Sequence, residues 1–124
     1  MCLIVSKSIP IIAKKDIICY KIYNKTKEGH LSSPYLGYIA SIQNFTKLEP
    51  DPISNGCAYV ITSGFHSFKH LKDAKYEIKW YPFIYKNSVI YKCIIPKGSK
   101  YYRGLYARRV SYCSESLILK EVCV

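Results

Sequence analysis

The chain has 124 residues, of which 49% are apolar, and a formal net charge of +11. This length fits a single domain that buries a core without a metal or disulfide staple, so we expect one domain over residues 1–124. The apolar share excludes disorder as a description of the whole chain, and the lack of an internal period excludes a repeat array. The charge has two explanations: a polyanionic partner, or lysines that only keep the protein soluble.

The cysteine pattern bears on the compartment. Six cysteines are present, but no two of them form a C-x-x-C motif and none has a histidine at zinc-finger spacing. Several lie in apolar, strand-like runs, which favours free buried thiols in a reducing compartment over a disulfide framework. The N-terminal run MCLIVSKSIPII is interrupted by Lys7 and Pro10, which is typical of neither a signal peptide nor a membrane span. We therefore expect a cytoplasmic protein with no membrane partner.

The first half of the chain alternates strand-like and polar segments. β-branched and aromatic residues predict a strand over 16–23, and polar residues predict a loop over 24–33. Residues 35–42 return to strand character. The prolines and glycine of 44–56 predict an extended surface loop, and CAYVIT, at 57–62, predicts a short strand.

One helix is predicted, directly after the segment SGFHSF. Ser67 is the residue type of an N-cap, and Phe68, Leu71 and Ala74 fall on one helical stripe with lysines outside it. The aromatic segment 80–87 is expected to be an ordered connection that packs on the body.

The stretch IYKCIIPKGSKYYRG predicts a basic, tyrosine-rich hairpin. Residues 88–95 form its first strand, and the Pro-Lys-Gly sequence at 96–98 makes the turn, because Pro fixes φ and Gly permits the turn conformation. Residues 100–106 return as the second strand, and 116–122 close the chain as a third. These elements add up to an α+β fold, a single mostly antiparallel β domain with one or two short helices.

Tyrosines alternate with cations through this stretch and beyond it. A tyrosine ring can stack on a base while Lys or Arg binds phosphate, which is what a nucleotide or a single-stranded nucleic acid requires. Alternation along a strand would also place some of these tyrosines in the core, where they need no ligand. The candidate binding residues from this pattern are Lys97, Lys100, Tyr102, Arg103, Arg108 and Arg109.

Two histidines raise the question of a metal. His66 and His70 are four residues apart, a spacing that places two imidazoles on one helix face for zinc. No Glu follows His66 as in an H-E-x-x-H motif, and the sequence indicates no third ligand. We expect no metal site, because two histidines at a helix start beside surface lysines need no metal to explain them.

Four segments carry a resemblance: CYK at 19–21, SGFHSF at 63–68, CIIPKGSKYYRG at 93–104 and SYCSESLIL at 111–119. Their order resembles that of small uncharacterised proteins of gut anaerobes and their phages, over most of the chain. The layout is more distantly similar to the ADP-ribosyltransferase-like fold. In that family a first-strand Arg or His, a serine-containing segment before a helix and a late Glu surround NAD.

The resemblance to the transferases implies roles for individual positions. Glu115 falls where the catalytic Glu of that family stands, and Ser63 lies in the middle segment. Tyr20 or Lys21 occupies the position where the family has Arg or His, and Cys113 replaces the acidic residue two before the Glu. An enzyme of this kind would use NAD.

Three functions follow as hypotheses. The first is a non-catalytic, cofactor-free protein that captures an anionic nucleotide-type ligand with Tyr20, Ser63, His66 and the basic residues. As a phage or mobile-element accessory protein it could sequester a nucleotide signal and so serve host-defence evasion. The second is an NAD-dependent ADP-ribosyltransferase or glycohydrolase, with Glu115 polarising the ribose. The third is binding of single-stranded nucleic acid by the basic strands. A homo-oligomer stays open in each case.

Overall fold

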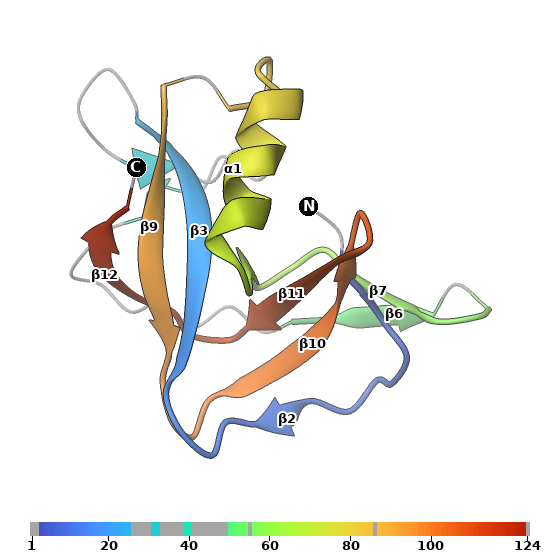
Figure 1. Ribbon diagram of the computed structural model, residues 1–124. Coiled ribbons are helices and arrows are strands. Elements are labelled where there is room, and N and C mark those ends of the chain that lie inside the picture. Colours follow the sequence, from blue (N-terminus) through green and yellow to red (C-terminus); the bar gives the residue numbers. More distant parts are fainter. Residues whose placement is uncertain are drawn as a thin grey trace.

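The computed structural model shows a strand-rich fold with a helix against one side (Figure 1). The structure describes residues 3–25, 31–32, 39–40, 50–54, 56–85 and 87–123. In chain order the elements are β1 (Leu3–Val5), β2 (Ile11–Ile12), β3 (Ile17–Lys25), β4 (Leu31–Ser32), β5 (Ile39–Ala40), β6 (Pro52–Ser54), β7 (Tyr59–Ile61), β8 (Phe65–Phe68), α1 (Leu71–Trp80), β9 (Ser88–Ile95), β10 (Lys100–Tyr106), β11 (Arg109–Ser114) and β12 (Ile118–Val122).

Neighbouring strands pair antiparallel in the order β12-β9-β3-β8-β11-β10-β1-β7-β6, with β2 also beside β10 and β4 between β3 and β5. α1 is the only helix in the part of the chain that the structure describes. The structure therefore agrees with the predicted α+β class of mostly antiparallel strands. Figure 1 also shows that β6 and β7 project away from the strands that carry the helix.

The strand pairings return to their starting point. β3 pairs with β8, β8 with β11, β11 with β10, and β10 with β2, which runs through residues 13–16 back into β3. Side chains from β3, β8, β10, β11 and the bend after β2 meet those of β9 in one cluster, in which Cys19, Cys93, Ile95 and Tyr112 are buried. This cluster is the interior core, and alternate residues of β3 point into it because successive side chains of a strand face opposite sides.

The Pro-Lys-Gly segment is a corner rather than a hairpin turn. The turn itself is confirmed, since Gly98 has a φ of 90°, but β9 pairs with β3 and β12 whereas β10 pairs with β11, β1 and β2. The predicted hairpin between 88–95 and 100–106 is therefore wrong. The corner instead lies beside the bend after β2, where Ala13 N donates to Ser99 O at 2.9 Å and Gly98 N donates to Ala13 O at 2.8 Å.

α1 packs outside the circuit, on the opposite face of β3 and β9. Leu71 and Ala74 from the helix meet Ile22, Phe68 and Ile90 from the strands. The predicted apolar stripe is therefore confirmed in its contacts, although Phe68 belongs to β8 and not to the helix. No helix in the described residues is long and apolar enough to cross a membrane.

The predicted start of the helix is wrong by three residues. Its N-cap is His70, whose backbone is extended, and Ser67 lies in β8, where it pairs with Tyr112 of β11 and is buried. The β-ladder therefore holds Ser67 in extended conformation, and the helix begins only after β8 has ended.

Other predicted boundaries divide into matches and corrections. β9 and β10 have the predicted bounds, and β7 lies within the predicted strand 57–62. β11 was missed, and β6 is a strand inside the segment predicted as a loop. Parts of three predicted elements lie outside the described residues. These are residues 26–30 and 33 of the first predicted loop, 35–38 and 41–42 of the predicted strand, and 44–49 of the second predicted loop.

Candidate functional site

The predicted catalytic residue, Glu115, is engaged by the backbone of a neighbouring strand. Its Oε1 accepts a hydrogen bond from Lys100 N at 3.0 Å, and its own N donates to Lys100 O at 3.1 Å. The residue is 7% exposed. These contacts continue the ladder between β10 and β11 by one pair, so the Glu115 carboxylate has a structural role.

Three other predicted residues surround the buried thiol of Cys113. His66 and Tyr102 lie opposite Cys113 on the two flanking strands, and the thiol donates to Ser63 O at 2.9 Å. The hydroxyl of Ser63 accepts Asp51 N at 2.8 Å, and the Tyr102 hydroxyl donates to Ser8 O at 2.7 Å. The polar groups of these side chains thus have partners within the protein.

His66 is buried and neutral near pH 7. Its Nε2 lies 3.1 Å from Ile61 O, and its own carbonyl accepts Lys21 Nζ at 2.8 Å. Burial, together with the nearby Lys21 ammonium, lowers the pKa of His66 to about 4. Burial also lowers the pKa of Lys21 itself, and burial raises that of Cys113 to about 12. The interior therefore disfavours charge at each of these groups.

Tyr20 lies apart from these residues. It pairs with Phe68 at the point where β3 meets β8, and it packs with the helix core. Hence Ser63, His66 and Tyr102 come together around Cys113, on the face of β11 opposite the interior core, whereas Tyr20 is on the helix side and Glu115 follows the end of β11. Among the described residues, no group of three or more His, Cys, Asp or Glu side chains could hold a metal ion.

Acidic and basic side chains are distributed differently between interior and surface. Among the described residues, Asp73, Glu77 and Glu115 are buried, and Asp16, Asp51 and Glu121 are exposed. The exposed cations are Lys7, Lys14, Lys15, Lys25, Lys72, Lys75, Lys79, Lys97, Lys100, Arg103, Arg108 and Lys120. The described surface is therefore more positive than composition alone indicates, because part of the negative charge lies inside.

This separation is sharpest on α1. Its exposed face carries Lys72, Lys75, Tyr76, Lys79 and Trp80, which we call the helix platform. The two acids of the helix, Asp73 and Glu77, are both buried. Within α1, all of whose residues the structure describes, every exposed residue is therefore a lysine or an aromatic residue.

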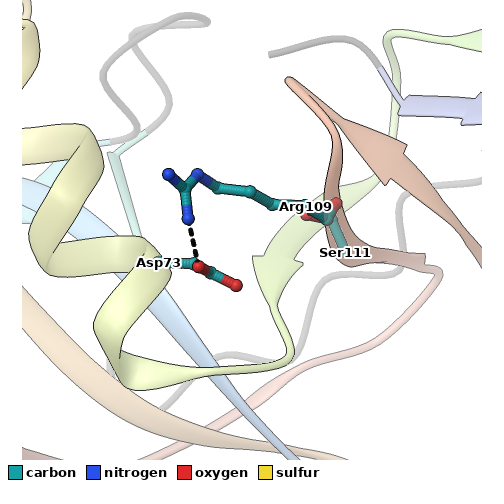
Figure 2. A network of polar contacts seen from close by, with 3 residues as sticks. All are labelled: Asp73, Arg109 and Ser111. Atoms are coloured by element: carbon teal, nitrogen blue, oxygen red, sulfur yellow. Dashed lines mark hydrogen bonds and ion pairs between the residues drawn. The ribbon is translucent and has the colours of Figure 1, made fainter.

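Hydrogen bonds hold both buried acids of α1. Figure 2 shows Arg109, at the start of β11, pointing at Asp73, with which it forms an ion pair. Ser111, also drawn there, donates to Arg109 O at 3.2 Å. Glu77 Oε1 accepts the hydroxyls of Tyr85 and Tyr106 at 3.1 and 2.6 Å. The helix is thereby fixed to the tip of the β10–β11 hairpin.

The same arginine also contacts an aromatic side chain of the helix platform. The Arg109 guanidinium lies 3.9 Å from the ring centroid of Tyr76, at cation–π distance. The ring of Tyr76 lies 5.8 Å from that of Trp80 at an interplanar angle of 46°, and Lys79 Nζ lies 5.9 Å from the Trp80 ring. Trp80 is nevertheless 58% exposed, and Phe83 in the following turn is 87% exposed. Large rings thus stand in solvent next to several cations.

Sequence reasoning placed no residue of the helix platform among its candidates, although it included Arg109, which contacts Tyr76. It missed Tyr76 and Trp80, although a signal was present: Lys72, Tyr76 and Trp80 recur every fourth residue, on the side of the helix opposite the predicted apolar stripe. The other predicted cations, Lys97, Lys100, Arg103 and Arg108, are exposed elsewhere on strands and turns.

No protein-family model, curated protein or solved structure matches this chain. The chemistry of the exposed surface is therefore the basis for a functional assignment.

Proposed function

We propose that this protein binds single-stranded nucleic acid on the helix platform. The observation that carries the proposal is the composition of the exposed face of α1, where Tyr76 and Trp80 stand among three lysines while both acids of the helix are buried. Bases stack on aromatic rings in a sequence-tolerant way, and cations beside the rings bind the phosphates that link those bases.

In this proposal the aromatic rings bind the bases and the lysines bind the phosphates. Arg109 covers one face of Tyr76, so a base would stack on the opposite face of that ring. Trp80, one helical turn further on, offers a second ring for the next base. Lys72, Lys75 and Lys79 lie on the same exposed side of α1, with Lys79 Nζ 5.9 Å from the Trp80 ring, and would neutralise the connecting phosphates.

Trp80 provides the direct test, because it is the only tryptophan in the chain. Titration with oligo-dT is expected to quench its fluorescence, since a stacked base contacts the indole. Anisotropy of a labelled oligo-dT gives the affinity independently. Binding seen by anisotropy without any change in Trp80 fluorescence would place the nucleic acid elsewhere, and no binding would refute the proposal.

A matched pair of charge reversals separates a site from diffuse attraction. Lys79→Glu and Lys97→Glu change the net charge equally at two exposed lysines, one on the platform and one at the corner after β9. A localised site predicts a clearly larger loss of affinity for Lys79→Glu. Equal losses would mean that the net charge alone attracts the oligonucleotide.

Capture of a free anionic nucleotide, such as a signal sequestered by a phage accessory protein in the cytoplasm, remains a second proposal. The same stacked rings and lysines support it, because a nucleotide presents one base and a few phosphates. Calorimetry with NAD, ADP-ribose and cyclic nucleotides distinguishes it from strand binding. A single strand should bind more tightly with increasing length, whereas a nucleotide-specific site should not.

The NAD-dependent transferase remains a prediction that rests on the ADP-ribosyltransferase-like layout and on Glu115. It predicts release of nicotinamide from NAD, with loss of release in Glu115→Gln. Because the Glu115 carboxylate holds Lys100 N, a thermal melt of the variant must accompany this assay. No release by the wild-type protein would leave Glu115 with its backbone contacts alone.

A further inference from the structure

The exposed aromatic side chains of the described residues all lie in one short segment, residues 76–83. They are Tyr76, Trp80, Tyr81 and Phe83, which are 45%, 58%, 46% and 87% exposed. The large apolar side chains exposed on other elements are aliphatic. Single apolar residues scattered over a surface need no explanation, whereas rings gathered at one end of α1 form a patch of the kind found at binding surfaces.

Phe83, the most exposed of these residues, lies in a turn that hydrogen bonds and packing hold in place. Tyr81 N donates to Glu77 O at 3.1 Å, which continues the hydrogen-bonding pattern of the helix. Ile84 N and Tyr85 N then both donate to Tyr81 O, at 3.1 and 3.2 Å. The side chains of Ile84 and Tyr85 pack into the core beneath α1. The Phe83 ring therefore stands in solvent on a backbone that is already ordered.

Phe83 also lies close to the rings of the helix platform. It follows Trp80 by three residues, and three residues span at most about 11 Å even when fully extended. Residues 71–85 are all described, and none of the exposed ones among them is acidic. A strand bound to the platform therefore meets a further ring, and no negative charge, directly beyond Trp80.

We propose that Phe83 is a third base-stacking residue, so that the rings of Tyr76, Trp80 and Phe83 bind three consecutive bases. This inference rests on the proposed function of the helix platform and adds to it a residue outside α1 and a minimum length of strand. A phenylalanine ring has no hydrogen-bonding group, so stacking is what it offers to a base. Because its backbone is already fixed, the ring loses little freedom when a base stacks on it. The platform lysines favour a polyanion over an apolar protein as the occupant of this patch.

Phe83→Ala tests the third ring directly, because a side chain that is 87% exposed can be removed without opening a cavity in the core. In anisotropy titrations we expect the affinity for oligo-dT of three or more nucleotides to fall at least about fivefold, the lower end of the effect of losing one stacked base. The affinity for the thymidine dinucleotide should change little, since it can still occupy Tyr76 and Trp80. An equal loss for the dinucleotide would show that Phe83 adds no third base position.

Ile9→Ala is the matched control for the loss of exposed apolar area. Ile9 lies next to β2 and is 76% exposed, so its removal should leave the titrations unchanged. Phe83→Leu separates stacking from general apolar contact, because it keeps a large apolar side chain without the ring. It should lose as much affinity as Phe83→Ala, whereas Phe83→Tyr should keep the wild-type affinity. Wild-type affinity in Phe83→Leu, or equal losses in Phe83→Ala and Ile9→Ala, would overturn the inference.

The same titrations distinguish failure of this inference from failure of the proposed function. If Trp80→Ala weakens binding and Phe83→Ala does not, the third ring is wrong and the platform stands. If the wild-type protein does not bind oligo-dT, the proposed function is wrong and the third ring is wrong with it.

Discussion

The β10–β1–β7–β6 end of the sheet and the helix platform both expose large apolar side chains, yet they differ in chemistry. That end of the sheet presents aliphatic Leu105, Ile4 and Ile53, whereas the platform presents the rings of Tyr76 and Trp80 among lysines. Aliphatic groups gain mainly by leaving water and so suit a flat apolar partner, while rings beside cations suit bases and phosphates. The exposed fractions of the side chains do not distinguish the two surfaces. The residue types and the neighbouring charges do, because they indicate different kinds of partner.

The largest change in stability is expected from a substitution at Gly104, where β10 lies close to β1. A Cβ at this position would lie 2.2 Å from Ile4 O and 2.7 Å from Val5 Cγ1, so Gly104→Ala must displace the backbone of β1. We expect a loss of about 3 kcal/mol or more in the free energy of unfolding, measured by urea denaturation. Oligonucleotide affinity at low temperature should be retained, because α1 does not contact Gly104.

Gly98→Ala is the comparison for this variant. A Cβ there meets nothing within 4 Å, so only the positive φ of 90° opposes the substitution. The cost should be about 1 kcal/mol. Equal destabilisation by the two variants would contradict the close approach of β1 to β10.

Low pH should reduce the free energy of unfolding through His66, whose Nε2 lies 3.1 Å from Ile61 O of β7. Unfolded His66 binds a proton below pH 6.5, but the folded residue does so only below about 4. The unfolded state therefore binds more protons between these values, and stability falls as the pH falls, by up to about 3 kcal/mol. Urea midpoints from pH 7 to pH 4 measure the loss.

Substitution separates His66 from the carboxylates that titrate in the same range. His66→Gln should flatten the part of the acid slope that His66 causes, whereas His70→Gln, at the exposed N-cap of α1, should keep it. An unchanged slope in His66→Gln would mean that another group is responsible.

Trp80→Ala should act on the platform alone. Loss of one stacking ring costs about 1–3 kcal/mol per base, or roughly 5- to 150-fold in affinity for oligo-dT. Leu105→Ala is the matched control, because Leu105 is a similarly exposed apolar residue on β10, away from α1, and its loss should leave the anisotropy titration unchanged. Equal losses in the two variants would place the oligonucleotide elsewhere than on the platform.

Local sequence patterns predicted the bounds of strands better than they predicted which strands pair with one another. The β-branched run of β9 and the basic run of β10 gave the bounds of both strands, but nothing within 15 residues could show that the corner between them separates two pairings. β11 was missed because Ser111, Cys113 and Ser114 interrupt its apolar pattern; these side chains are fully buried among neighbouring strands. Such burial depends on tertiary context, which strand propensity reflects only in part.

The candidate sites show the same limit. Tyr102 and His66 have residue types suited to ligands, and the structure uses them inside, with backbone carbonyls as partners. The sequence could have indicated Tyr76 and Trp80 through helical spacing alone. The ion pair of Arg109 with Asp73, in contrast, joins residues 36 positions apart, and no local pattern predicts it.

Salt should lower the affinity of the helix platform for oligo-dT. If three platform lysines bind phosphates, the affinity for oligo-dT should fall roughly 20-fold between about 50 and about 200 mM salt, because the logarithm of the binding constant falls by about 0.7 per phosphate for each tenfold rise in salt. An affinity that stays constant over this range would show that the lysines do not bind phosphates and that stacking on the rings alone holds the oligonucleotide.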